Sequence, residues 1–185
     1  MTSGTYSPAD DPLLTKRTVI IGTAIDDQSA QLTIAKLLFL NMQDGKSPIS
    51  LRIDSPGGSV TSSLAIIGTI TDIAAPVHTH AIHRCNGTAL LLLAVGLAGT
   101  RRATEHTHLS IEPTELHSAD STEQAQFHLA KLNSNMAEIL SAHTQLTKEE
   151  AHEALIKGKH FTVEQALSAG VIDVIDPLPR EDATE

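Results

Sequence analysis

A glycine turn between two differently patterned apolar runs constrains this chain more than any other feature. Ile49, Leu51 and Ile53 alternate with polar residues, which is the pattern of a half-buried strand. The turn DSPGGSV, residues 54–60, follows directly, and Ser59 within it is a natural N-cap for a helix. Apolar residues then recur at helical spacing as far as Pro76: Leu64, Ala65, Ile67, Ile70 and Ile73. The stretch therefore predicts a strand, a turn and a helix, and the two glycines let the backbone approach a bound group closely.

The same alternation of strands and helices is expected along the rest of the chain. Apolar alternation predicts further strands over residues 17–23, 77–83, 107–111 and 171–175. Helical spacing, capping residues and glycine stops predict helices from Asp26 or Asp27 to about residue 45, and over residues 88–97, 122–144, 147–158 and 162–170. This order indicates an α/β domain over residues 13–176, with flexible segments at residues 1–12 and 177–185.

The composition limits which classes of partner the chain is expected to bind and which cellular compartment it is expected to occupy. The chain carries a formal net charge of −9 and only 2% aromatic residues, so neither a basic surface nor a stacking platform for nucleic acid is expected. Its single cysteine, Cys85, excludes an internal disulfide. Residues 1–12 lack the apolar core of a secretory signal, and the longest apolar run, residues 89–98, is too short to span a bilayer. These features predict a cytoplasmic protein that binds neither nucleic acid nor membrane.

Two runs of the sequence resemble one known protein family. The run LRIDSPGGSV, the helix predicted after it and the later run LLLLAVGLAGTRR are similar to the Clp protease proteolytic subunit (ClpP) family, and the resemblance extends over about residues 13–175. It implies a ClpP/crotonase-like α/β fold of repeated ββα-type units with a long helix in the C-terminal half. It also implies a Ser-His-Asp triad, in which a histidine takes the proton of the serine and a carboxylate orients the histidine.

All three triad positions that the resemblance implies carry other residues in this chain. Counted without gaps from the apolar run that follows it, the serine position falls on Gly87. Counted from the Gly-x-Arg segment at residues 99–101, the histidine position falls on Glu112. Counted back from HFTVEQALSAGVID, the aspartate position falls on Gly158, next to Lys157, where the family has an arginine at contacts between rings. The resemblance therefore implies a non-catalytic member that acts as a structural or regulatory subunit.

Assembly and the oxyanion hole are the other properties that the resemblance implies. The two backbone N–H donors of the hole would belong to Gly58 and Thr88. Residues 114–121 contain no glycine and are fewer than in the family's glycine-rich strand, which argues against two stacked rings. A homo-oligomeric ring or a mixed ring with an active paralogue is compatible with the sequence. The family also implies an AAA+ unfoldase as a possible partner, and no cofactor is expected.

Several other side chains are candidates for nucleophilic chemistry. Thr88 with Glu112 as its base would give an active peptidase with a rearranged nucleophile, and Ser110 with Glu112 on one strand face is a similar arrangement. Cys85 and His83, interpreted as neighbours on one strand face, would supply a thiol with a base. A buried structural cysteine is the commoner case.

The histidines and the glycine turn allow two further hypotheses. His78 with His80, and His106 with His108, each share a strand face and could supply two ligands of a zinc site. No cysteine cluster or HExxH helix supports such a site, so no metal is predicted.

A crotonase-like acyl-thioester binding protein is the second of these hypotheses. In such a protein the N–H groups of Gly58 and Thr88 would hold the thioester oxygen, with Glu112 as acid or base. The chain is shorter than these enzymes usually are, and it shows no basic patch for the phosphates of coenzyme A.

Overall fold

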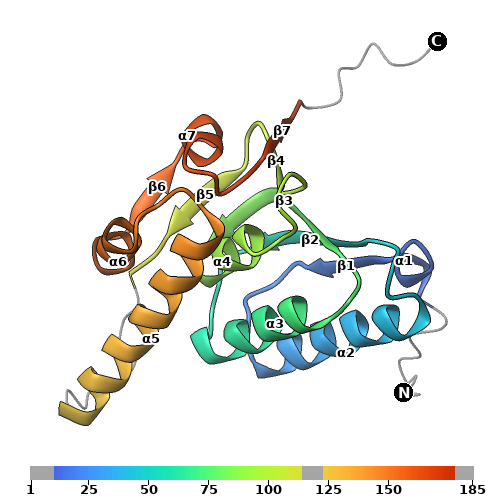
Figure 1. Ribbon diagram of the computed structural model, residues 1–185, viewed down its shortest axis with the longest axis horizontal. Helices are drawn as coiled ribbons and strands as arrows, with labels where there is room; N and C mark the ends of the chain where they lie inside the picture. The colour runs from blue at the N-terminus through green and yellow to red at the C-terminus, as the bar shows by residue number, and fades with distance from the viewer. Residues whose placement is uncertain (1–10, 114–122, 178–185) are drawn as a thin grey trace, which may run out of the picture.

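One mixed β-sheet organises the chain (Figure 1). The computed structural model describes residues 11–113 and 123–177, which contain seven strands. Five strands run parallel in the order β1 (Thr18–Ile21), β2 (Ile49–Ser55), β3 (Val77–Asn86), β4 (Arg102–Thr104) and β7 (Val174–Asp176). The end of β3 also pairs in parallel with β5 (His108–Ile111), and β6 (Lys159–Phe161) adds to β5 in antiparallel orientation. The sheet and its helices confirm the predicted α/β class.

Seven helices are described, and capping residues explain where most of them begin. They are α1 (Pro12–Thr15), α2 (Asp27–Gln43), α3 (Val60–Asp72), α4 (Thr88–Ala94), α5 (Glu123–His143), α6 (Lys148–Lys157) and α7 (Val163–Ser168). Asp26 and Ser29 form a capping box at the start of α2, and Ser59 accepts a hydrogen bond at the start of α3. The predicted boxes of Thr147 and Thr162 begin α6 and α7. Figure 1 shows α2 and α3 side by side and α5 as the long helix of the C-terminal half.

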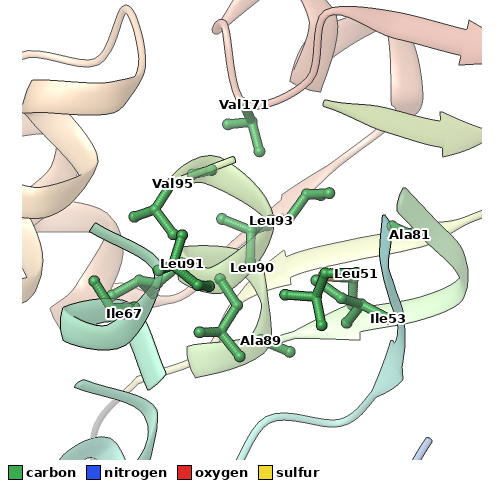
Figure 2. Packing of buried hydrophobic residues seen from close by; sticks show 14 of the residues in the cluster. Leu51, Ile53, Ile67, Ala81, Ala89, Leu90, Leu91, Leu93, Val95 and Val171 are labelled. Carbon is green, nitrogen blue, oxygen red and sulfur yellow. The ribbon is translucent and has the colours of Figure 1, made fainter. Parts of the chain in front are cut away.

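The core is aliphatic and centres on α4, all of whose residues are buried. Figure 2 shows the leucines of α4 among side chains from β2, β3 and α3, including Leu51, Ala81 and Ile67. Burying one leucine stabilises a fold by about 2 kcal/mol. Because α4 is buried all round, the residues at its N-terminus are held firmly, and they form part of the site described below.

Short elements account for most differences from the sequence prediction. The prediction missed β4, β6 and α1, which are too short to show a periodic pattern. α4 ends earlier than predicted, because Leu97 leaves the helix and its N–H donates to Val77 O at 2.8 Å. β3 extends beyond the predicted end at residue 83, because its last residues pair with β5. The last strand begins at Val174, whereas Val171 is buried outside it.

Three predicted segments fall largely beyond the described residues. Residues 1–10, 114–122 and 178–185, which include most of the two predicted flexible ends and the polar segment 114–121, lie outside them. Within residues 11–113 and 123–177, no helix combines the length and the apolar character that crossing a bilayer requires.

Candidate functional site

The turn between β2 and α3 is locked against the segment that precedes α2. Ile25 N–H donates to Gly57 O at 2.8 Å, and Ser59 N–H donates to Ile25 O at 2.7 Å. A Cβ atom built on Gly58 would lie 2.2 Å from Ile25 O, which is far inside contact distance. Only glycine therefore fits at position 58.

The turn between β3 and α4 forms the opposite side of the same region. Gly87 has φ 54° and ψ −126°, a strained conformation, and its N–H donates to Ser110 O at 2.9 Å. A Cβ atom built on Gly87 would lie 3.7 Å from Cβ and Cγ of Glu112 and 3.6 Å from Pro56 O. These are ordinary contact distances, so a side chain at position 87 would have room and would touch Glu112.

A pocket of about 530 Å³ lies between the two turns. Its lining residues come from both turns, from the segment before α2 and from the segment after β5: Ile25, Asp26, Pro56, Gly58, Ser59, Val60, Gly87, Thr88, Glu112 and Pro113. The backbone N–H groups of Gly58 and Thr88 donate to no other described residue. Both residues whose amides the family pattern assigns to an oxyanion hole therefore line this pocket.

Gly158 is the third triad position that the resemblance implies, and it lies near the C-terminal end of β5. It ends α6 with φ 76° and ψ 150°, a conformation that is essentially restricted to glycine. A Cβ atom built on it would lie 3.2 Å from Pro113 Cδ and 3.5 Å from Ile111 O. The structure thus brings Gly87, Glu112 and Gly158 together around the end of β5, although the three are far apart in the sequence.

The hydroxyl groups of the site are already hydrogen-bonded to protein atoms. Thr88 Oγ1 shares a buried hydrogen bond of 2.8 Å with Ser63 Oγ and lies 3.5 Å from Gly58 O. Ser110 Oγ donates to Glu112 Oε1 at 2.5 Å. No hydrogen bond joins Thr88 to Glu112 in the described residues, so the structure assembles the predicted Ser110–Glu112 pair and does not assemble the Thr88–Glu112 pair.

Besides its contact with Glu112, Ser110 lines a second cavity. This cavity, of about 570 Å³, is lined by Ser110, Asn86 and His160 among others, and it does not include Gly87 or Thr88. With its amide nitrogen facing these acceptors, Asn86 donates to Ser110 Oγ at 3.2 Å and to His108 O at 3.1 Å. Ser110 is therefore held between Asn86 and Glu112 and lies away from the two free amides.

Sequence reasoning missed Ser63 and Asn86. Ser63 lies on the buried side of α3 with Ile67 and Ile70, so a polar residue within an apolar helical stripe was the available signal. Asn86 ends β3, and only the pairing of β3 with β5 reveals its neighbours.

The structure does not place Cys85 and His83 on one face of β3, so that part of the prediction is wrong. Cys85 is fully buried, whereas His83 is exposed. The cause is an irregularity in the pairing of β2 with β3, where Ser55 aligns with Cys85 after Ile53 has aligned with Ala81. Burial, assisted by the charge of Asp54, raises the pKa of the Cys85 thiol far above its usual range. Cys85 therefore remains a protonated core residue.

The histidine pairs take separate roles in the structure. His80 Nε2 lies 3.2 Å from Asp176 Oδ2, while His106 and His108 are exposed. The rings of His83 and His108 meet edge to face with centroids 5.9 Å apart. Among the described residues no three His, Cys, Asp or Glu side chains gather in a way that could hold a metal ion.

Comparison with known proteins gives one consistent family. The family model described as Clp protease matches residues 5–177. ATP-dependent Clp protease proteolytic subunit 2 of Streptomyces avermitilis is 33% identical over 168 residues, which cover 88% of this chain and 84% of the relative. The protein of the same description from Frankia casuarinae is 34% identical over 167 residues, which cover 88% of this chain and 76% of the relative.

Proposed function

Because the chain belongs to the Clp protease family, we propose that it is a non-catalytic member, which serves as a structural or regulatory subunit of a ring. The ring would contain further copies of this chain or an active paralogue. An AAA+ unfoldase is the class of enzyme that would work with such an assembly.

Gly87 is the observation that carries this proposal. The turn before α4 places position 87 within side-chain contact of Glu112 and at the edge of the pocket that contains the Gly58 and Thr88 amides. A nucleophile at this position would be near both a base and the donors that stabilise an oxyanion. Glycine supplies no atom for the attack.

The other hydroxyls near the pocket do not substitute for a nucleophile at position 87. Thr88 Oγ1 is buried at the start of α4, and its hydrogen bond with Ser63 Oγ holds it there. A general base must be able to accept the proton of the nucleophile, but Glu112 is hydrogen-bonded to Ser110 instead of Thr88. What the pocket retains is a pair of backbone donors, which suits binding of a peptide carbonyl or carboxylate without cleavage.

Covalent labelling tests the absence of catalysis directly. We expect the wild-type protein to show no mass increase after incubation with a fluorophosphonate probe, while an active family member treated in parallel is labelled. An adduct that maps to Thr88, Ser110 or Cys85 would contradict the proposal and would identify the nucleophile. Ser110 is the strongest competing candidate because of its 2.5 Å hydrogen bond to Glu112.

A double substitution provides the matched positive control within this chain. Gly87→Ser with Glu112→His places a hydroxyl and an imidazole at two positions that are already in contact distance. We expect this variant to gain probe labelling at residue 87 that neither single substitution shows. Labelling of the wild type equal to that of the double variant would contradict a role for Gly87 in the loss of activity.

The ring-forming role has its own test. Light scattering coupled to size-exclusion chromatography should report an oligomer for the protein alone or after mixing with an active paralogue. A monomer under both conditions would contradict the proposed structural role and would leave the labelling result unaffected.

A further inference from the structure

The pocket between the two glycine turns has an acidic lining. Among the described residues that line it, the only ionisable side chains are those of Asp26 and Glu112, and no lysine, arginine or histidine is present. Gly58 and Thr88, whose backbone N–H groups donate to no other described residue, line the same pocket. The pocket therefore combines free hydrogen-bond donors with two carboxylates, and a ligand has to suit both.

The fold places one carboxylate beside each of the two turns. Ile25 forms an isolated parallel bridge with Gly58, and Asp26 follows Ile25 directly. In the turn before α4, Cβ and Cγ of Glu112 lie 3.7 Å from where a Cβ atom of Gly87 would be. A negative charge therefore accompanies each side of the pocket, next to the place where a ligand oxygen would meet the free amides.

Both carboxylates are available to a ligand. Hydrogen bonds from the backbone N–H and the hydroxyl of Ser29 lower the pKa of Asp26, whose side chain is exposed, so this carboxylate is ionised at neutral pH. Glu112 is also exposed, and Ser110 donates to its Oε1, so that Oε2 accepts no hydrogen bond from another described residue. The pocket therefore keeps two negative charges next to its donors.

These charges discriminate between the two kinds of acceptor that the amides could bind. A ligand carboxylate would meet two like charges within one pocket, which disfavours it. A neutral carbonyl meets no such repulsion, and a cationic side chain next to that carbonyl would be attracted by both carboxylates. The volume of about 530 Å³ has room for a carbonyl group together with one long side chain.

We propose that this pocket selects a basic peptide segment, with a peptide carbonyl on the amides of Gly58 and Thr88 and an adjacent lysine or arginine side chain near Asp26 and Glu112. The same two carboxylates disfavour acidic segments and free carboxyl ends. The inference rests on the proposed absence of cleavage, because the peptide has to stay intact while it is bound. It narrows the ligand from any peptide to a basic one.

Fluorescence anisotropy with defined peptides tests this preference. Three hexapeptides carry the same uncharged fluorophore and an amidated C-terminus, and they differ only in a central Lys, Gln or Glu. We expect the wild-type protein to bind the Lys peptide about tenfold more tightly than the Glu peptide, with the Gln peptide between them. Added salt should reduce the difference.

A fourth peptide separates the carbonyl from the carboxylate. It has the central Gln and a free C-terminal carboxylate, and it should bind no more tightly than its amidated counterpart. Tighter binding of this peptide would overturn the proposal. Equal affinity for the Lys and Glu peptides, or no measurable binding of any of the four, would overturn it as well.

Variants that remove one charge each locate the preference. Glu112→Gln can still accept from Ser110, and Asp26→Asn keeps a good N-cap, so both should fold and each should reduce the preference for Lys over Glu about threefold. Asp72→Asn removes the same charge at the far end of α3, about 18 Å along the helix from Val60, which lines the pocket. This control should leave the preference unchanged. If all three variants lower it alike, total charge explains the preference and the proposed site is wrong.

Two measurements on the wild-type protein separate the possible failures. Hydrogen exchange of the segments that contain the Gly58 and Thr88 amides should slow when the Lys peptide is added, and this test needs no variant to fold. Unchanged exchange there, despite measurable binding, would place the peptide elsewhere and overturn the proposal. Mass spectrometry should find the Lys peptide intact after incubation. Fragments would overturn the proposed function and this inference with it, whereas an intact peptide bound without charge preference would overturn this inference alone.

Discussion

The two glycine turns that border the pocket have the same position between strand and helix but differ in why they contain glycine. At Gly58 a side chain is excluded, because a Cβ atom would lie 2.2 Å from Ile25 O. At Gly87 the nearest atoms to a Cβ would be 3.6–3.7 Å away, so the surroundings would accept a side chain. Close contact with Ile25 therefore requires glycine at position 58, whereas no close contact requires glycine at position 87. The comparison shows that absence of a side chain at Gly87 is not imposed by the space available in the fold.

The largest expected effect is that of Gly58→Ala. The added methyl group collides with the backbone of Ile25 and disturbs the two hydrogen bonds that lock this turn. Overpacking and backbone strain together should lower the free energy of unfolding by about 4 kcal/mol. Urea unfolding followed by circular dichroism measures the change. A loss below about 1 kcal/mol would show that the turn yields, and the contrast between the two glycines would disappear.

Gly68→Ala is the matched control for that substitution. Gly68 lies inside α3, is exposed, and has no atom within 4 Å of a built Cβ. Because alanine has the higher helix propensity, this variant should be more stable than the wild type by about 0.5–1 kcal/mol. The same chemical change should therefore have opposite signs at the two positions.

Gly87→Ala should have an intermediate effect. The methyl group finds room, but the combination of φ 54° and ψ −126° costs a residue with a Cβ atom about 1–3 kcal/mol. The same unfolding measurement should place this variant between the wild type and Gly58→Ala. A loss as large as that of Gly58→Ala would mean that the space beside Glu112 is closed, and it would weaken the argument for an unfilled position.

The smallest expected effect is on the stability of the protein in acid, and it concerns Asp26, the residue that follows Ile25. Hydrogen bonds from the N–H and hydroxyl of Ser29 hold the pKa of Asp26 below its usual value of 3.8. A lowered pKa stabilises the fold above the unfolded pKa, and this contribution is lost as the pH falls through the folded value. Asp26→Ser retains a cap without a titrating group, so its stability should fall less than that of the wild type below about pH 4.

Thermal unfolding of both proteins over a series of acidic pH values measures this difference. Parallel curves would show that the cap before α2 contributes nothing that depends on pH. In that case the ionised side chain of Asp26 would not help to hold the segment before α2 against the turn between β2 and α3.

The strand, turn and helix around residues 49–73 were predictable because each leaves a local signal. Alternation marks β2, adjacent glycines mark the turn, and Ser59 marks the start of α3. The short strands β4 and β6 were not predictable, because three residues carry no period and their pairing partners are distant in the sequence. The fold class therefore followed from the sequence, while these short strands did not.

The candidate site was predictable only in part. Matching the sequence to the family pattern singled out Gly87, Glu112 and Gly158, and the structure brings these positions together. The hydrogen bonds of Thr88 with Ser63, and of Ser110 with Glu112, depend on which side chains face each other across elements. For that reason sequence alone favoured Thr88 over Ser110 as the partner of Glu112, whereas the structure pairs Ser110 with Glu112.

The backbone at Gly158 has a consequence for how this chain can change by substitution. Its φ of 76° and ψ of 150° suit glycine alone, and Pro113 Cδ lies 3.2 Å from where a Cβ would be. An aspartate there would press on Pro113 in addition to straining the backbone, whereas a serine at Gly87 would meet no close contact and would be strained only by its positive φ. The side chains that the family pattern implies would therefore meet a tight contact at position 158 and none at position 87. The end of α6 at Gly158 therefore carries a steric constraint on substitution that the turn at Gly87 lacks.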